Sequence, residues 1–256
     1  MPEQPTAQAT DTSSLLGRLE GTSATQMTVE LVEAINPYLQ RIVLTGSLPP
    51  AYVAPGQDVM LLFPTEEDRH LRRRYSVRRY EPGESRLELN VASHGRGPGS
   101  RWALEVQPGD AMEVIGPRGK VPLAPAEHHV FLGDLASLAA ISSLVESVPE
   151  GDDVEAMVLV PGVATWPELA AFSGAPVTVR YLVAEPSADP APLLNHLEQL
   201  ELPEGTHVYC FGEAKVVRAL KAALLDRGLS SDSFSTKAYW NAAKANRGHG
   251  EPPKDA

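Results

Sequence analysis

The pattern of apolar residues changes once along the chain, near Pro125, and this change limits the fold more than any other feature. Before Pro125, strand-length apolar runs are separated by short turns rich in proline and glycine, as is typical of an antiparallel barrel or sandwich. These runs are RIVLTG (41–46), DVMLLF (58–63), RRYSVRRY (73–80), RLELNVAS (86–93) and DAMEVIG (110–116). The only helix-like stretch in this part lies around Arg101–Val106.

After Pro125, near-continuous apolar runs alternate with helical segments, which is typical of a parallel α/β sheet buried on both faces. The five candidate strands are HHVFLG (128–133), VEAMVLV (154–160), VTVRYLV (177–183), HVYCFG (207–212) and FSTKAYW (234–240). Helices are expected after the first strand, at about 192–200 and at about 213–227.

We therefore predict a two-domain α/β chain, with a β-barrel followed by a five-stranded parallel sheet. The first 20 residues are rich in Thr, Ser, Ala, Gln and Pro, which is typical of a flexible tail. The predicted parts are this tail at 1–20, a barrel domain at 21–125, an α/β domain at 126–241 and a basic C-terminal extension at 242–256.

Composition argues against several classes of protein. Of the 256 residues, 43% are apolar, too many for a chain that is disordered throughout. There is no run of about 18 apolar residues that would indicate a transmembrane helix. The N-terminus lacks the basic start and apolar core of a secretory signal. Cys210 is the single cysteine, cannot form an internal disulfide and favours a reducing compartment, so we expect a cytoplasmic protein.

The distribution of charge is uneven. Acidic residues outnumber basic residues 33 to 22, a net charge of −11, which argues against nucleic acids and anionic membranes as partners. Yet RHLRRRYSVRR (69–79) contains six arginines. So many guanidinium groups in one strand favour a local anionic ligand such as a phosphate or carboxylate. The alternative is an edge strand whose charges keep it from aggregating.

Within this segment, Arg73-Arg74-Tyr75-Ser76 resembles the R-x-Y-[ST] flavin-binding motif of the ferredoxin-reductase-like superfamily. Tyr75 can lay its ring against an isoalloxazine. The Ser76 hydroxyl can donate a hydrogen bond to the flavin N5 or accept one from it as the redox state changes. Arg73 or Arg78 can offer a planar fork to the FAD pyrophosphate.

A glycine-rich loop in HGRGPGSRW (94–102) follows about twenty residues later. We expect it to open a helix at Ser100, where N–H groups at the helix start form an anion site for the same pyrophosphate. Its three glycines allow the main chain to approach closely. The alternative is a structural turn with Ser100 as helix cap and Trp102 in the core.

Six segments, in order along the chain, are similar to the siderophore-interacting protein family of FAD-containing ferric-siderophore reductases. They are RRRYSVRRYEP, HGRGPGSRW, QPGD, VIGPRGK, GEAKVVRAL (212–220) and KAYWNAAKANRGHG (237–250). The resemblance implies a ferredoxin-reductase-like fold whose N-terminal antiparallel Greek-key barrel binds FAD. The expected FAD contacts are Arg73, Tyr75, Ser76, Val77, Arg78, His94, Gly97, Pro98, Gly99, Ser100 and Trp102. Of these, Tyr75 and Ser76 are expected to act catalytically.

The resemblance also implies that the α/β domain receives electrons at the ends of its strands. The expected NAD(P)H contacts are Gly133, Asp134, Gly212 and Glu213. The family pattern Gly-Asp-Glu-Thr-Ala-Leu-Pro-Ala-Ile is altered here, because Leu135 and Ala136 replace its Glu and Thr. Hydrogen bonds to a nicotinamide or ribose are thereby lost unless Ser137 compensates. Ferredoxin and an external reduced flavin are therefore alternative donors.

Two further groups of residues have two interpretations each, and a pair of histidines has one. Tyr239 and Trp240 either cover the second face of the flavin or pack the edge of the sheet. Four basic residues either bind an anionic siderophore or are solvated surface charge. They are Arg118, Lys120, Lys244 and Arg247. His128 and His129 have no partners at metal-ligand spacing, so we predict no metal site.

The sequence thus favours one-electron reduction of a ferric siderophore by bound FAD, with iron released as Fe(II). Fe(III) is a hard cation, and an added electron lowers its preference for the hard oxygen ligands of a siderophore. Two alternatives remain, a general flavin or flavodoxin reductase and a non-catalytic carrier of ferric siderophore.

Overall fold

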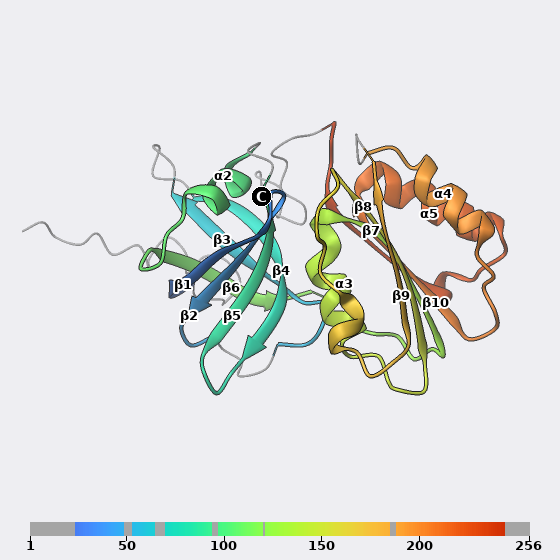
Figure 1. The fold of residues 1–256 in the computed structure, drawn as a ribbon, viewed down its shortest axis with the longest axis horizontal. Coiled ribbons are helices and arrows are strands. Elements are labelled where there is room, and N and C mark those ends of the chain that lie inside the picture. The colour runs from blue at the N-terminus through green and yellow to red at the C-terminus, as the bar shows by residue number, and fades with distance from the viewer. Residues whose placement is uncertain are drawn as a thin grey trace, which may run out of the picture.

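The computed structural model describes residues 24–48, 53–64, 70–93, 97–119, 121–184 and 188–243. Within them, a closed six-stranded antiparallel barrel and a five-stranded parallel sheet stand side by side (Figure 1). This confirms the predicted fold class. The predicted tail at 1–20 and most of the predicted C-terminal extension lie outside the described residues. So do four of the predicted site residues, His94, Lys120, Lys244 and Arg247.

The barrel strands follow the order β1-β2-β5-β4-β3-β6, in which β2, β5, β4 and β3 form a Greek key. They are β1 (Thr25–Asn36), β2 (Leu39–Thr45), β3 (Asp58–Pro64), β4 (His70–Glu81), β5 (Arg86–Ala92) and β6 (Ala111–Arg118). Alternate residues face inward, so that Leu87, Leu89 and Val91 of β5 are buried. Each such side chain stabilises the fold by about 1.5–3 kcal/mol.

Helix α2 (Pro98–Glu105) connects β5 to β6 and covers one end of the barrel (Figure 1). Ala103 and the following Val106 join the barrel core. The helix begins at Pro98 rather than at Ser100, which corrects the predicted start. Proline is favoured in this first position because its missing N–H would have no partner there.

The parallel sheet has the order β11-β10-β7-β8-β9. Its strands are β7 (His128–Asp134), β8 (Asp153–Val160), β9 (Val177–Val183), β10 (Thr206–Glu213) and β11 (Phe234–Trp240). Each predicted strand is confirmed to within one residue at either end. The apolar runs are most regular in the central strands β7, β8 and β10, which are buried along nearly their whole length.

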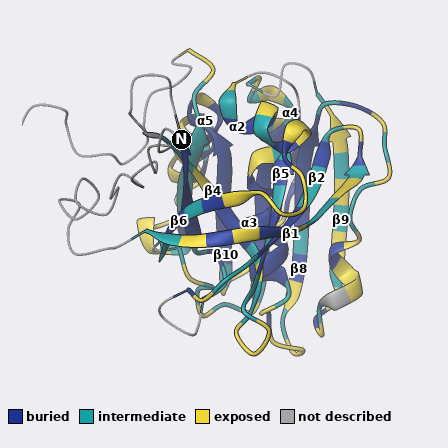
Figure 2. Ribbon diagram, turned by 90° about the vertical axis from the view of Figure 1, so that its left-hand side faces the viewer, coloured by how far each residue is buried: buried dark blue, intermediate teal, exposed yellow. Residues whose placement is uncertain are grey.

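Helices cover both faces of the sheet. On the outer face lie α4 (Ala191–Gln199) and α5 (Ala214–Asp226), while α3 (Leu138–Val145) lies between the sheet and the barrel (Figure 1). All eight residues of α3 are buried, as expected for an apolar helix covered on two sides. Figure 2 shows buried residues running through the strands of both domains and exposed residues gathering in the turns. None of the helices in the described part of the chain is long and apolar enough to cross a membrane.

Candidate functional site

The predicted flavin motif lies on the part of β4 that precedes its pairing with β5. The ladder between β4 and β5 begins at the pair Val77–Leu89, whereas the ladder between β4 and β3 extends back through Ser76 to His70. The segment Arg73–Ser76 therefore belongs to a ladder on one side only. Among the described residues, no ladder uses the backbone groups on the other edge of this segment, the open edge of β4, which leaves them to a ligand.

Tyr75 and Ser76 point to opposite sides of β4, because successive side chains of a strand alternate. Tyr75 packs against the barrel core, with its ring centre 6.3 Å from that of Trp102. Burial raises the pKa of Tyr75, so its hydroxyl stays protonated at neutral pH. The Ser76 hydroxyl faces the α/β domain, 3.4 Å from the Tyr239 hydroxyl. A flat ring placed along the open edge of β4 could contact both residues.

The first turn of α2 lies directly against this segment. A β-carbon on Gly99 would lie 1.9 Å from the Tyr75 hydroxyl oxygen and 3.8 Å from Cγ of Arg73, so no larger residue fits without displacing Tyr75. The N–H groups of a first helical turn have no partner within the helix. Gly99 thus brings the expected pyrophosphate site next to Arg73, the arginine expected to share the anion.

A hollow of about 400 Å³ lies beside α2, between the helix and the barrel strand β3. Trp102 and Arg101 line it, and the Trp102 ring meets Phe63 edge to face with the ring centres 5.6 Å apart. Trp102 thus packs partly against the core, as expected of a structural tryptophan, and partly lines the hollow, as a residue that contacts FAD could do. Contact between Trp102 and FAD stays a prediction.

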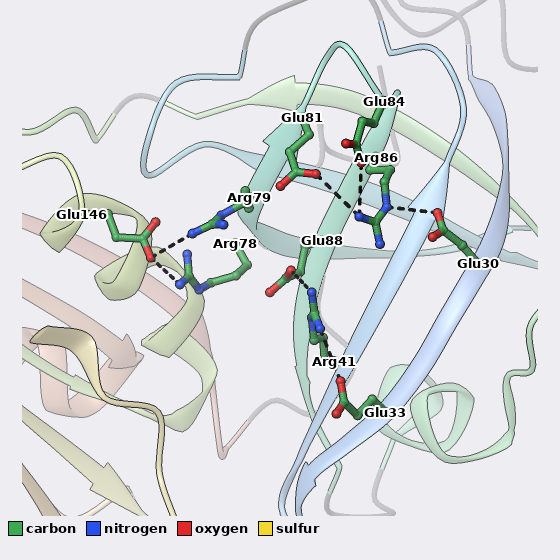
Figure 3. Close-up of polar contacts among 10 residues, drawn as sticks. All are labelled: Glu30, Glu33, Arg41, Arg78, Arg79, Glu81, Glu84, Arg86, Glu88 and Glu146. Carbon is green, nitrogen blue, oxygen red and sulfur yellow. Dashed lines mark hydrogen bonds and ion pairs between the residues drawn. The ribbon is translucent and has the colours of Figure 1, made fainter. Parts of the chain in front are cut away.

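Arg78 joins the two domains through an ion pair. Its guanidinium forms an ion pair with Glu146, the residue that ends α3, and Arg79 approaches the same carboxylate at 3.6 Å (Figure 3). The pairing of β4 with β5 shifts register between Val77 and Arg79, which re-aims the residue between them. The Arg78 side chain thus links the barrel to the α/β domain, and its contact with FAD stays a prediction.

The two domains also meet in a polar cluster beside Ser76. Lys237 of β11 donates a 2.9 Å hydrogen bond to Oδ2 of Asp58, whose side chain is only 3% exposed. The Lys237 ammonium lies 4.9 Å from the centre of the Tyr239 ring. In the described structure, the buried Oδ1 of Asp58 has no hydrogen-bond partner, although Arg74 comes within 3.8 Å of it. A cation and a phenol from the α/β domain are therefore held against the strand that carries the flavin motif.

Sequence reasoning missed Asp58 and Lys237. Two signals were present: Asp58 begins an apolar run that must be buried, and Lys237 shares the period-two alternation of Tyr239 in FSTKAYW. A carboxylate at the start of a buried strand needs a cationic partner. The sequence could not show that this partner comes from a residue 179 positions later.

Asp134 lies at the end of β7 and is 4% exposed. Oδ2 accepts hydrogen bonds from the Trp240 indole at 2.7 Å and from the Glu213 backbone at 2.9 Å, while Oδ1 accepts from the backbone of Ala136 at 3.0 Å. Burial raises the pKa of Asp134 to about 6, although these hydrogen bonds favour the ionised form. The carboxylate thus makes three hydrogen bonds within the fold, and its contact with NAD(P)H stays a prediction.

Glu213 is also internal. Its Oε2 caps the start of α5 by accepting from the backbone of Lys215 and Val216, and Oε1 accepts from the Ala242 backbone at 3.0 Å. The helix start that was expected to face a dinucleotide is thus occupied by the carboxylate of the preceding residue. The expected contact between Glu213 and NAD(P)H stays a prediction.

Gly133 and Gly212 serve this packing as well. A β-carbon on Gly212 would lie 2.5 Å from Oδ2 of Asp134, and one on Gly133 would lie 2.4 Å from Oγ of Ser137. The Ser137 hydroxyl is fully buried and donates to the Asp134 backbone carbonyl at 2.7 Å. Ser137 therefore does not replace the hydrogen-bonding side chains lost at Leu135 and Ala136. Backbone contact of NAD(P)H at the two glycines stays a prediction.

The remaining predicted residues divide in two. Trp240 packs the edge of the sheet through Asp134, whereas Tyr239 lies beside Ser76 and keeps its predicted contact with the flavin open. Arg118 ends β6 opposite Asp58, near the polar cluster, and its contact with a siderophore stays a prediction. Among the described residues, no group of three or more His, Cys, Asp and Glu side chains could hold a metal ion.

Comparison with known families matches both domains. Residues 56–121 match the siderophore-interacting FAD-binding domain, and residues 126–243 match the siderophore-interacting protein family. The first range contains the flavin motif and α2, and the second contains the whole parallel sheet. The chain therefore carries an FAD-binding domain of this family.

Individual relatives agree. The chain is 30% identical to the ferric vibriobactin reductase ViuB of Vibrio cholerae, over 70% of this chain and 67% of that protein. It is 28% identical to the NADPH-dependent ferric-chelate reductase of Escherichia coli, over 85% and 92%. A siderophore utilization protein from T. fusca superposes with a TM-score of 0.78 at 32% identity, over 89% of this chain and 96% of that one. The chain belongs to the siderophore-interacting protein family.

Proposed function

We propose that the protein is an FAD-dependent oxidoreductase that reduces ferric siderophores and releases the iron as Fe(II) in intracellular iron acquisition. One observation carries the proposal most directly. The open edge of β4, with Tyr75 and Ser76, lies between the first turn of α2 and the polar cluster brought by β11. The names of the relatives, ferric vibriobactin reductase and ferric-chelate reductase, support the same activity.

The residues fit the cofactor. Arg73 and the N–H groups at the start of α2 would hold the pyrophosphate, because both favour an anion and Gly99 keeps them together. Tyr75 would pack against the isoalloxazine, and the Ser76 hydroxyl would hydrogen-bond its N5. Tyr239, which faces Ser76 from the α/β domain, would limit the space on the far side of the ring.

When bound, FAD takes up two electrons from a donor and supplies them one at a time to an acceptor. The chain's own residues have three tasks. The hydroxyls of Ser76 and Tyr239 would hold a proton for N5, which gives up a proton as the flavin is reoxidised. Lys237, held by its ion pair with Asp58, would keep the Tyr239 side of the site in place. Arg118, which lies opposite Asp58, would attract an anionic ferric complex, an effect that salt should weaken.

The iron itself is substrate and needs no protein ligand. Two ferric complexes take one electron each and leave as Fe(II) complexes, while the two-electron donor is oxidised once, so the electrons balance. Fe(II) prefers the hard oxygens of the siderophore less and can be passed on.

For the electron donor we propose NAD(P)H, supported by the Escherichia coli relative named NADPH-dependent. The internal roles of Asp134, Glu213 and Ser137 leave ferredoxin as the alternative. Mixing the FAD-loaded protein anaerobically with NADH, NADPH or reduced ferredoxin, and following the loss of flavin absorbance, distinguishes these donors.

Purified protein reconstituted with FAD tests the proposed function. It should turn yellow and, once reduced with dithionite and freed of excess reductant, should transfer two electrons per flavin to a ferric siderophore. An Fe(II)-specific chelator measures the product. A colourless protein that ignores added FAD would refute the proposal. Faster reoxidation by flavodoxin or quinones than by ferric siderophores would favour a general reductase instead.

A further inference from the structure

Strand β5 and the residue after it carry two buried polar side-chain atoms that have no hydrogen-bond partner among the described residues. They are the carboxamide oxygen Oδ1 of Asn90 and the hydroxyl oxygen of Ser93, a residue that is only 6% exposed. A buried polar atom without a partner destabilises a fold, so each such atom calls for an explanation. A ligand that completes the missing hydrogen bond is one such explanation.

Both residues lie where β5 separates from β4. The ladder between these two strands ends at the pair Val77–Leu89. From Asn90 to Ala92, β5 pairs with β2 alone. Across a seam in the barrel wall, the other edge of β5 therefore faces the open edge of β4. In the part of the chain that the structure describes, no ladder uses the backbone groups on either side of this seam.

The register of the ladder shows which side chains share a face at the seam. Counting back along β4 from the last pair, Ser76 comes opposite Asn90, and Arg73 comes opposite Ser93. Opposite residues of an antiparallel pair project to the same face, and their β-carbons are about 4.5–5.5 Å apart while the strands stay paired. Asn90 therefore shares the face of Ser76, whereas Ser93 shares the face of Arg73.

On the face of Ser76, a flavin offers the donor that Asn90 lacks. Ser76 is expected to hydrogen-bond the flavin N5, and the C4 carbonyl and then N3–H follow N5 along the ring. N3–H is the single N–H group of the oxidised isoalloxazine. A carboxamide carries both an acceptor and donors. Asn90, which is half-buried, can thus accept from N3–H through Oδ1 and donate to a neighbouring ring carbonyl through Nδ2.

On the face of Arg73, the expected ligand group is the pyrophosphate. Gly99 holds the first turn of α2 close to Arg73, and both favour an anion there. A serine hydroxyl can donate a hydrogen bond to a phosphate oxygen. Ser93 would thus add a neutral donor to a site that already has a guanidinium and backbone N–H groups.

We propose that Asn90 and Ser93 form a second wall of the flavin site, opposite the flavin motif of β4. Asn90 recognises the pyrimidine end of the isoalloxazine by accepting a hydrogen bond from N3–H, and the Ser93 hydroxyl donates to the FAD pyrophosphate. This inference rests on the proposed function insofar as that function places the flavin along the open edge of β4. Bound FAD would then complete the hydrogen bonds of both atoms.

Binding of FAD and 3-methyl-FAD to the full-length protein tests the role of Asn90 without turnover. The methyl group replaces the N3 hydrogen, so the unchanged protein should bind FAD at least about tenfold more tightly, as measured by quenching of flavin fluorescence. Asn90→Leu should bind the two flavins with similar affinity. Asn90→Asp keeps an acceptor and should still prefer FAD. Asn195→Leu makes the same change at an exposed position of α4 and should leave the preference unchanged.

Riboflavin, which has no phosphate, tests the role of Ser93. Ser93→Ala should weaken the binding of FAD about fivefold and leave the binding of riboflavin unchanged. Each variant alters an atom that has no partner among the described residues, so the flavin-free variants should melt close to the temperature of the unchanged protein. That measurement separates a loss of flavin contact from a loss of fold.

Equal affinity of the unchanged protein for FAD and 3-methyl-FAD would overturn the assignment of Asn90. So would an undiminished preference in Asn90→Leu, or a lost preference in Asn90→Asp. Ser93→Ala that weakens both FAD and riboflavin, or neither, would overturn the assignment of Ser93. Each of these results leaves the proposed function standing if the FAD-loaded protein, once reduced with dithionite, still reduces a ferric siderophore. Conversely, loss of that reduction with the flavin preference intact would refute the proposed function alone.

Discussion

The indole of Trp240, at the end of β11, donates a 2.7 Å hydrogen bond to the buried carboxylate of Asp134, at the end of β7. The two strands are not neighbours, because β10 lies between them. The bond crosses β10 at Gly212, where a β-carbon would lie 2.5 Å from the carboxylate. This bond fixes the end of β11 and, with it, the position of Tyr239 opposite Ser76.

The burial of Asp134 predicts an unusual dependence of stability on pH. Its folded-state pKa of about 6 is above its ordinary value of 3.8, so between these values the folded state binds more protons than the unfolded state. Stability from this group therefore rises as the pH falls through 6 and is lost as the pH rises. From pH 7 to pH 5 the gain is about 1 kcal/mol. Urea unfolding of the wild type and of Asp134→Asn at both pH values measures it, and identical pH slopes would contradict the prediction.

The close approach of Gly99 to Tyr75 predicts a rescue. Gly99→Ala should displace the Tyr75 ring and weaken FAD binding at least tenfold, about 1.4 kcal/mol, as measured by quenching of flavin fluorescence. Adding Tyr75→Phe removes the clashing hydroxyl and leaves the nearest ring carbon 3.2 Å away, so the double variant should regain part of the affinity. Gly83→Ala, which meets nothing within 4 Å, is the matched control. A double variant no better than Gly99→Ala would count against this placement of Tyr75.

The flavin motif itself can be tested by truncation. Tyr75→Ala and Ser100→Ala should both lower FAD occupancy of the purified protein, because the first removes ring contact and the second alters the first turn of α2. The ratio of flavin absorbance to protein absorbance measures the occupancy. Unchanged occupancy in both variants would show that the flavin lies elsewhere.

The Arg78–Glu146 pair predicts a loss of stability without a loss of flavin. The Arg78 side chain is 10% exposed, so removing it should cost more than the 0–1 kcal/mol of a surface pair and less than the 3–5 kcal/mol of a fully buried pair, about 2 kcal/mol. Arg78→Met should lower the free energy of unfolding accordingly and leave FAD affinity within about twofold. Arg79→Met, at a more exposed side chain, should cost about 0.5 kcal/mol. A large loss of FAD affinity in Arg78→Met but not in Arg79→Met would instead support the expectation that Arg78 contacts FAD.

The Lys237–Asp58 pair predicts partial compensation. Lys237→Met removes the cation nearest to the buried Asp58 carboxylate, whereas Arg74 is 3.8 Å away, and should cost about 2–4 kcal/mol of stability. Adding Asp58→Asn removes the uncompensated charge, so the double variant should be more stable than Lys237→Met. Chemical unfolding of the four proteins provides a double-mutant cycle. Additive losses would show that the two residues do not interact.

Local pattern was enough to predict most of the fold. The runs at 177–183 and 234–240 are strands over the same residues, although both lie at an edge of the sheet and few of their residues are buried. Their β-branched and aromatic residues were enough to predict them. The start of α2 was predicted two residues late, because Ser100 offered a capping hydroxyl whereas Gly97 and Pro98 set the actual start.

What the sequence determined by itself is the order of the two domains, the strands of each and the residues of the flavin motif, because hydrophobic period and turn chemistry are local properties. Only the tertiary structure showed which polar side chains form pairs within the fold. Arg78, Asp134 and Glu213 found partners 68, 106 and 29 positions away. A buried charge needs a partner of opposite charge or a hydrogen bond, and the partner is whichever group the fold brings close. The spacing of residues along the chain does not show which group that is.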